Sequence, residues 1–158
     1  MSESLQKAMN HKEDYLHSPV DDLHSFYWVA QWAVLFNNHN KSHRSPKEHK
    51  WQQYISDGQV EHKMSVASDI KQVYPMSGHS PITMEWAVLL KEWHASLEKL
   101  NTDWLEVRFS DEVTSGAATP EYFEKKFHIF AFRGLVDFME VVQRHAVKLQ
   151  SYNNFDTK

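Results

Sequence analysis

The chain has 158 residues, a formal net charge of −4 with its histidines neutral, and no cysteine. This length predicts one domain with a sizeable apolar core, and the 13% of aromatic residues predicts that large side chains fill it. The lack of cysteine excludes disulfides, zinc–thiolate sites and thiol nucleophiles. No basic run exceeds two residues, so a nucleic-acid partner is not expected.

The N-terminal sequence, MSESLQKAMNHKED, lacks the apolar stretch of a secretory signal. The longest apolar run elsewhere is too short to cross a bilayer, which needs about 20 residues. We therefore expect a cytoplasmic or nuclear protein that does not bind membranes. We expect a single helical domain over residues 1–158, with residues 1–16 and 151–158 at its periphery.

The segment 18–38 is the stretch around which we expect the rest of the chain to pack. Ser18 is suited to cap a helix, Pro19 to occupy its first position, and Asp21 to complete a capping box. Asp21 and Asp22 also place negative charge at the positive end of the helix dipole. These residues predict a helix over 19–37.

This helix is apolar on nearly every side. Between Phe26 and Phe36, Gln31 is the only polar residue. Since such a helix must be covered by protein in all directions, we expect a central, buried helix.

Three further pairs of Ser or Thr followed by Pro predict helix starts at residues 46, 81 and 120. At the first of these, Ser45 and Glu48 repeat the cap and acid of a capping box. The helix that starts at residue 46 is expected to end at the Asp57-Gly58 turn, and another helix is expected to cover 59–74. The start at residue 81 begins a long helix with one apolar stripe: Ile82, Trp86, Leu89, Leu90, Trp93, Leu97 and Leu100.

The last helix carries its own apolar face: Phe123, Phe127, Phe130, Ala131, Phe138, Val142 and Leu149. Gly134 interrupts this face and should let a neighbouring helix approach closely. We expect an irregular loop over 108–119, a short helix over 2–9, and Trp104–Phe109 as the only candidate strand. Few Gly and Pro residues also argue against an all-β fold, so we predict an all-α fold of five to six helices. We interpret the Trp and Phe stripes as core.

The segment HSPVDDLHSFYWVAQWAVLFN, residues 17–37, resembles a motif of the fungal-type protein kinase family. In that motif a His is followed, after a short gap, by Asp-Asp-Leu-x-Ser-Phe and an aromatic, apolar run. Residues 1–5 are similar to the family's segment after the activation loop, and residues 51–73 to its next helical region.

The resemblance implies a fold like the lower half of a kinase C-lobe, with 19–37 as its central helix. Asp22 and Ser25 match the motif, and the resemblance makes these two residues the structural anchor of the helix. The kinase catalytic motifs are absent, and the glycines at 58, 78, 116 and 134 are too far apart to form a nucleotide-covering loop. We therefore expect a truncated, pseudokinase-like module that is not an enzyme and takes no nucleotide, cofactor or metal.

A cluster of His and Arg residues at 39–49 supports an alternative function. His39 and His43 lie four residues apart, as two metal ligands on a helix would, and Arg44 and His49 match the Arg-x4-His element of helical ribonucleases. The polar sequence around the histidines and the helix start at Pro46 argue that these residues do not share one helix face. The alternative is a small helical hydrolase or ribonuclease.

The resemblance also implies that the segments covering the central helix in a complete kinase lobe are missing. Residues 26–36 would then leave an apolar patch larger than monomers tolerate. We therefore expect a regulatory or binding module that takes a protein partner or forms a homodimer.

Overall fold

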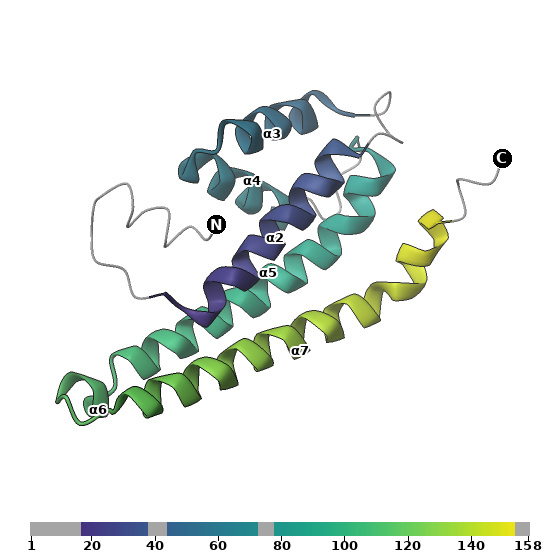
Figure 1. Ribbon diagram of the computed structural model, residues 1–158. Helices are drawn as coiled ribbons and strands as arrows, with labels where there is room; N and C mark the ends of the chain where they lie inside the picture. Colours follow the sequence, from purple (N-terminus) through teal and green to yellow (C-terminus); the bar gives the residue numbers. More distant parts are fainter. Residues whose placement is uncertain (1–16, 38–43, 73–77, 154–158) are drawn as a thin grey trace. The chain divides into compact units, whose positions relative to one another are not determined.

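The computed structural model describes residues 17–37, 44–72 and 78–153. Within these ranges the chain forms six α-helices and no strand, which confirms the all-α prediction (Figure 1). The helices are α2 (Pro19–Phe36), α3 (Pro46–Asp57), α4 (Val60–Gln72), α5 (Pro81–Arg108), α6 (Asp111–Thr114) and α7 (Pro120–Asn153).

Two details differ from the prediction. Residues 104–108 of the candidate strand are helical, because α5 continues to Arg108 with Trp104 buried in line with its stripe. The expected loop over 108–119 contains the short helix α6. The predicted helix at residues 2–9 lies outside the described residues.

The four Ser-Pro and Thr-Pro pairs all mark true helix starts, since Pro19, Pro46, Pro81 and Pro120 are each the first residue of a helix. Proline is favoured there because its ring sets φ near the helical value and its missing N–H needs no partner. The predicted turn after α3 is also confirmed, with Gly58 in the left-handed conformation at φ 73°.

The described chain divides into two compact units, and α2, α5 and α7 each contribute to both. Unit 1 contains residues 17–26 and 93–140. Unit 2 contains the described residues of 27–92 together with 141–153. The prediction of a single domain stays a prediction.

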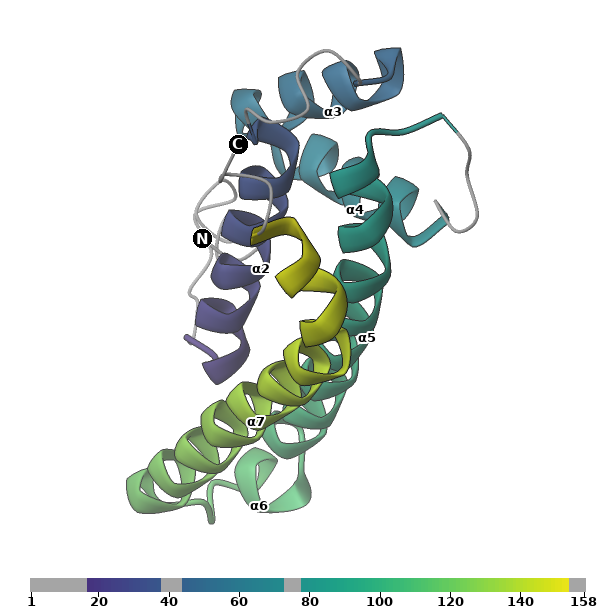
Figure 2. The same cartoon turned by 90° about the vertical axis from the view of Figure 1, so that its right-hand side faces the viewer.

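In unit 1 the second part of α5 and the first part of α7 run side by side, joined through α6 (Figure 2). Gly134 lies where these helices meet α2, and a Cβ atom placed on it would lie only 2.1 Å from Leu23 Cδ1 and 2.7 Å from Leu100 Cδ2. The close approach predicted at Gly134 is therefore confirmed. The Asp103–Arg133 ion pair, 2.7 Å between Oδ2 and Nη1, also joins α5 to α7.

In unit 2, α3 and α4 pack against each other. The buried Trp51 of α3 donates its indole N–H to Asp69 of α4 at 2.8 Å. Gln52 of α3 donates its side-chain amide to the carbonyl oxygen of Leu35 in α2 at 2.6 Å. These bonds fix α3 to both of its neighbours.

The burial expected for the central helix holds on one side only. Tyr27, Val34 and Leu35 are buried, as the apolar run predicts. Phe26, Val29 and Trp32 are more than half exposed. The prediction of a helix covered in nearly every direction is therefore wrong for the face that these three residues occupy.

Candidate functional site

The residues matched to the kinase motif lie in the first turns of α2. The Asp22 side chain is 73% exposed, and its Oδ2 lies 3.7 Å from His17 Nε2. The buried carboxylate at this helix end belongs to Asp21, which accepts the backbone N–H of Ser18 at 2.8 Å. Ser25 donates its hydroxyl to the carbonyl oxygen of Asp21 at 3.0 Å. The anchoring role of Asp22 stays a prediction, whereas the carboxylate that caps the helix is that of Asp21.

The His/Arg cluster is described only in part, because His39 and His43 lie outside the described residues. The Arg44 guanidinium donates to the carbonyl oxygen of Asn37. The exposed His49 ring has its Nδ1 3.2 Å from Gln52 Oε1. Arg44 and His49 are thus each occupied by a different neighbour, and the described part of the cluster forms no shared site.

A buried polar cluster in unit 2 surrounds the carboxylate of Glu48. Glu48 accepts the backbone N–H of Ser45 at 2.6 Å, which completes the capping box of α3 that the sequence predicted. It also accepts the backbone N–H of Ser80, at 3.1 Å to each oxygen, directly before α5. One carboxylate therefore holds the N-terminal ends of two helices.

This environment lowers the pKa of Glu48 to about 2. Burial alone would raise the pKa, since it disfavours the charged form, but hydrogen bonds from Ser80, Thr83 and Ser45 outweigh it. Glu48 is therefore ionised at neutral pH, at the positive ends of two helix dipoles.

The same cluster contains a Ser–His–Glu grouping with the composition of a hydrolase triad. Ser45 Oγ lies 3.0 Å from His79 Nδ1, and Glu48 Oε2 lies 3.7 Å from that same nitrogen. In a working triad, the histidine contacts the nucleophile through one ring nitrogen and the carboxylate through the other. Here both Ser45 and Glu48 lie next to the same nitrogen, Nδ1. The His79 side chain is also nearly buried and stacks on Trp51 at 5.1 Å between ring centroids. The cluster therefore organises the fold and is not placed to perform acyl transfer.

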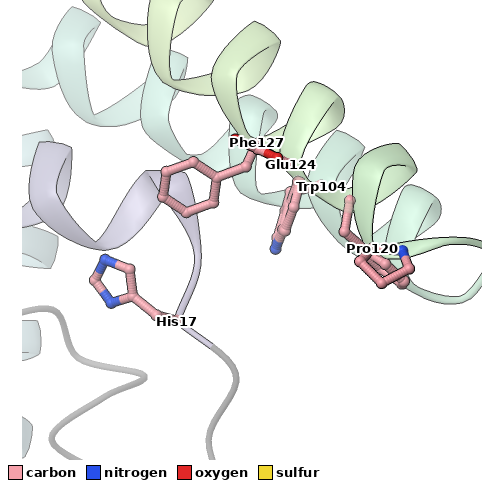
Figure 3. A pocket seen from close by; sticks show the side chains of 6 residues that line it. His17, Trp104, Pro120, Glu124 and Phe127 are labelled. Atoms are coloured by element: carbon pink, nitrogen blue, oxygen red, sulfur yellow. The ribbon is translucent and has the colours of Figure 1, made fainter.

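A pocket of about 400 Å³ lies in unit 1 (Figure 3). Its lining is mainly aromatic and comprises His17, Trp104, Pro120, Phe123, Glu124 and Phe127. The only carboxylate among these side chains, that of Glu124, is exposed and lies 3.8 Å from His128. Ligand sites normally add several convergent polar groups to an apolar wall. The lining of this pocket provides apolar contacts but lacks such a set of convergent polar groups.

A large uncovered apolar surface of unit 1 lies on α7. We call it the outer face of α7 and define it by five large exposed side chains: Ile129, Phe132, Leu135, Val136 and Met139. At 100° per residue these five fall within one third of the helix circumference. The buried Phe130, Gly134 and Val141 lie on the opposite side of α7. The helix is therefore apolar on two faces, and only the inner face is covered.

The outer face is visible in the sequence as a second set of apolar residues at helical spacing, which our prediction did not include. The predicted Phe-rich stripe lies on the inner face, where Phe130 is buried and the other Phe side chains of the stripe are partly exposed. Ile129, Phe132, Val136 and Met139 form a second stripe out of phase with it. Periodicity shows that residues share a face, and it does not show which face finds a neighbour.

Within the described ranges, no three His, Asp or Glu side chains lie together as metal ligands. None of the described helices is both long and apolar enough to span a bilayer. No protein-family model, curated protein or solved structure matches the chain. The kinase resemblance therefore stays a prediction.

Proposed function

We propose that the chain is a non-catalytic helical module that binds protein through the outer face of α7. The observation that carries this proposal is the exposure of five large apolar side chains on one face of a regular helix. Together they leave on the order of 500 Å² of apolar surface, in the size range where patches on monomers mark interaction sites. Water contact with so much apolar surface is unfavourable, so a protein that covers it gains free energy.

The origin of this module in a fungal-type kinase lobe is part of the proposal and rests on residues 17–37. A binding role agrees with the lack of kinase catalytic motifs, because phosphoryl transfer needs parts that cradle ATP. The alternative, a helical hydrolase or ribonuclease, would require His43, Arg44 and His49 to converge. Arg44 and His49 have separate partners, which favours the binding role.

A photo-reactive phenylalanine analogue, benzoylphenylalanine, tests the binding surface in the cells that produce the chain. Phe132 on the outer face and Phe109 between α5 and α6 form a matched pair, 69% and 67% exposed. We expect a protein adduct from Phe132→benzoylphenylalanine and none from the control at Phe109. If the analogue gives no adduct at 132, or the same adducts at both positions, the outer face is not a binding surface.

A further inference from the structure

We propose that the occupant of the outer face of α7 is a second copy of this chain, bound with the two α7 helices antiparallel. This inference rests on the proposed function and adds the partner, the orientation and the register. Apart from Gln143, which only marks one end of the exposed row, the residues that carry it belong to unit 1.

The first argument is the spacing of the exposed residues. Ile129, Phe132, Val136 and Met139 follow one another at intervals of three, four and three residues. This is the a/d spacing of a heptad, at which one helix packs its side chains between those of another. A face with this spacing is therefore suited to a helical occupant.

The second argument is the symmetry of this row about Gly134. Reversing the direction of the helix pairs Ile129 with Met139 and Phe132 with Val136 of the other copy. The row ends at Lys125 on one side and Gln143 on the other, which are also equidistant from residue 134. A patch with this internal symmetry is self-complementary across a two-fold axis, the commonest arrangement of homodimers.

Leu135 and the charged residues beside the row decide the orientation. The row has two edges, one occupied by Leu135 and the other by Lys126 and Glu140. In an antiparallel pair each edge meets the same edge of the other copy, so Leu135 contacts Leu135 of the other copy beside the two-fold axis. On the other edge, Lys126 meets Glu140 of the other copy. Arg133 lies on this edge between them and meets Arg133 of the other copy beside the axis, where its ion pair with Asp103 offsets the like charge. In a parallel pair the two edges face each other, which places Leu135 against Glu140. The Leu135 contact and the two Lys126–Glu140 pairs therefore favour the antiparallel pair.

The area is sufficient for a specific but modest interface. Two outer faces of on the order of 500 Å² bury about 1,000 Å², close to the lower limit for biological interfaces. We therefore expect a dimer that dissociates on dilution.

Disulfide trapping tests the partner and the register, because the chain contains no cysteine. Under mild oxidation, Leu135→Cys should link to itself. An equal mixture of Ile129→Cys and Met139→Cys should give a mixed dimer, while each alone stays largely unlinked. Phe109→Cys is the exposed control and should stay unlinked. Efficient self-linking of Ile129→Cys and Met139→Cys would indicate a parallel pair and overturn the proposal.

Light scattering at tens of micromolar tests the dimer without cross-linking. We expect a mass near twice the 18.7 kDa of the chain, a monomer for Phe132→Glu, and an unchanged dimer for Phe109→Glu. Both side chains are exposed, so circular dichroism should show that both variants keep the native fold. A monomer for the unmodified chain overturns this inference. The proposed function then survives only if the analogue at residue 132 links to a different protein.

Discussion

Gln31 is fully buried in α2, where the rest of the central segment is apolar. Neither its amide nitrogen nor its amide oxygen has a hydrogen-bond partner among the described residues. A buried amide without partners has lost its bonds to water and gained nothing in return, which costs about 1–3 kcal/mol. Gln52, by contrast, is satisfied, since its amide donates to the carbonyl oxygen of Leu35. The two residues form a natural comparison within unit 2.

We predict that Gln31→Met stabilises the protein by about 1–2 kcal/mol, because methionine keeps the shape of the side chain and removes its polar atoms. Gln52→Met should destabilise it, since the same change there breaks a hydrogen bond and leaves the Leu35 carbonyl unpaired. Urea unfolding followed by tryptophan fluorescence measures both free energies. A loss of stability in Gln31→Met would mean that the amide makes a stabilising bond.

At the scale of elements, the N-terminus of α2 shows how one position decides the role of a carboxylate. Ser18 accepts the backbone N–H of Val20 at 3.1 Å, and Asp21 accepts that of Ser18, so the pair forms the capping arrangement that the sequence predicted. Asp22 points to solvent, where its partner is the half-exposed ring of His17. The kinase resemblance nevertheless places the anchor at Asp22.

We predict that Asp21→Ala lowers the free energy of unfolding by about 1–2 kcal/mol through loss of the cap. Asp22→Ala should change it by less than about 0.5 kcal/mol, as expected for an exposed side chain with one surface contact. Chemical denaturation of the two neighbouring variants gives the comparison directly. If Asp22→Ala proved to be the more costly change, the anchor that the resemblance implies would be supported.

The two apolar faces of α7 show what the sequence cannot predict about a helix, namely which of its apolar faces is covered. The existence and start of this helix could be predicted, because Thr119-Pro120 and the Phe spacing are local signals. The exposure of Phe132 and Met139 could not, because it depends on which side α5 occupies. Glu48 illustrates the same limit. Its bond to Ser45 lies within one turn and was predicted, whereas its bond to Ser80 joins residues 32 positions apart.

At the scale of the whole molecule, composition and periodicity were enough to predict an all-α fold, and the Ser-Pro and Thr-Pro pairs were enough to predict the four helix starts at proline. The exposed face of α2 was missed for a reason that belongs to this scale. An apolar run shows that Val29 and Trp32 would gain by burial, but the chain has only a limited number of elements with which to cover them. Exposed apolar faces are often interaction surfaces, so the exposure on α7 is the observation on which the proposed binding role rests.

The response of the whole fold to acid should depend on His24, which lies in α2 within unit 1. The pKa of His24 is lowered from 6.5 to about 4, mainly by burial and secondly by the nearby His94. The carboxylates of Asp21 and Glu98 act in the opposite direction and do not compensate. At neutral pH the ring is therefore neutral in the folded protein, and protonating it requires placing a charge in a partly buried position.

We predict that stability is lost as the pH falls from about 6.5 towards 4. The unfolded chain binds a proton on His24 near pH 6.5, before the folded chain does, so this stability is fully present only above that value. Between pH 7.5 and pH 5.0 the loss should be about 2 kcal/mol. His24→Gln should lose less over the same range, while His128→Gln, an exposed control, should behave like the unmodified protein. Urea midpoints at both pH values measure the difference. An unmodified protein that is equally stable at the two values, or a His24→Gln variant with undiminished pH dependence, would show that another group controls the response to acid.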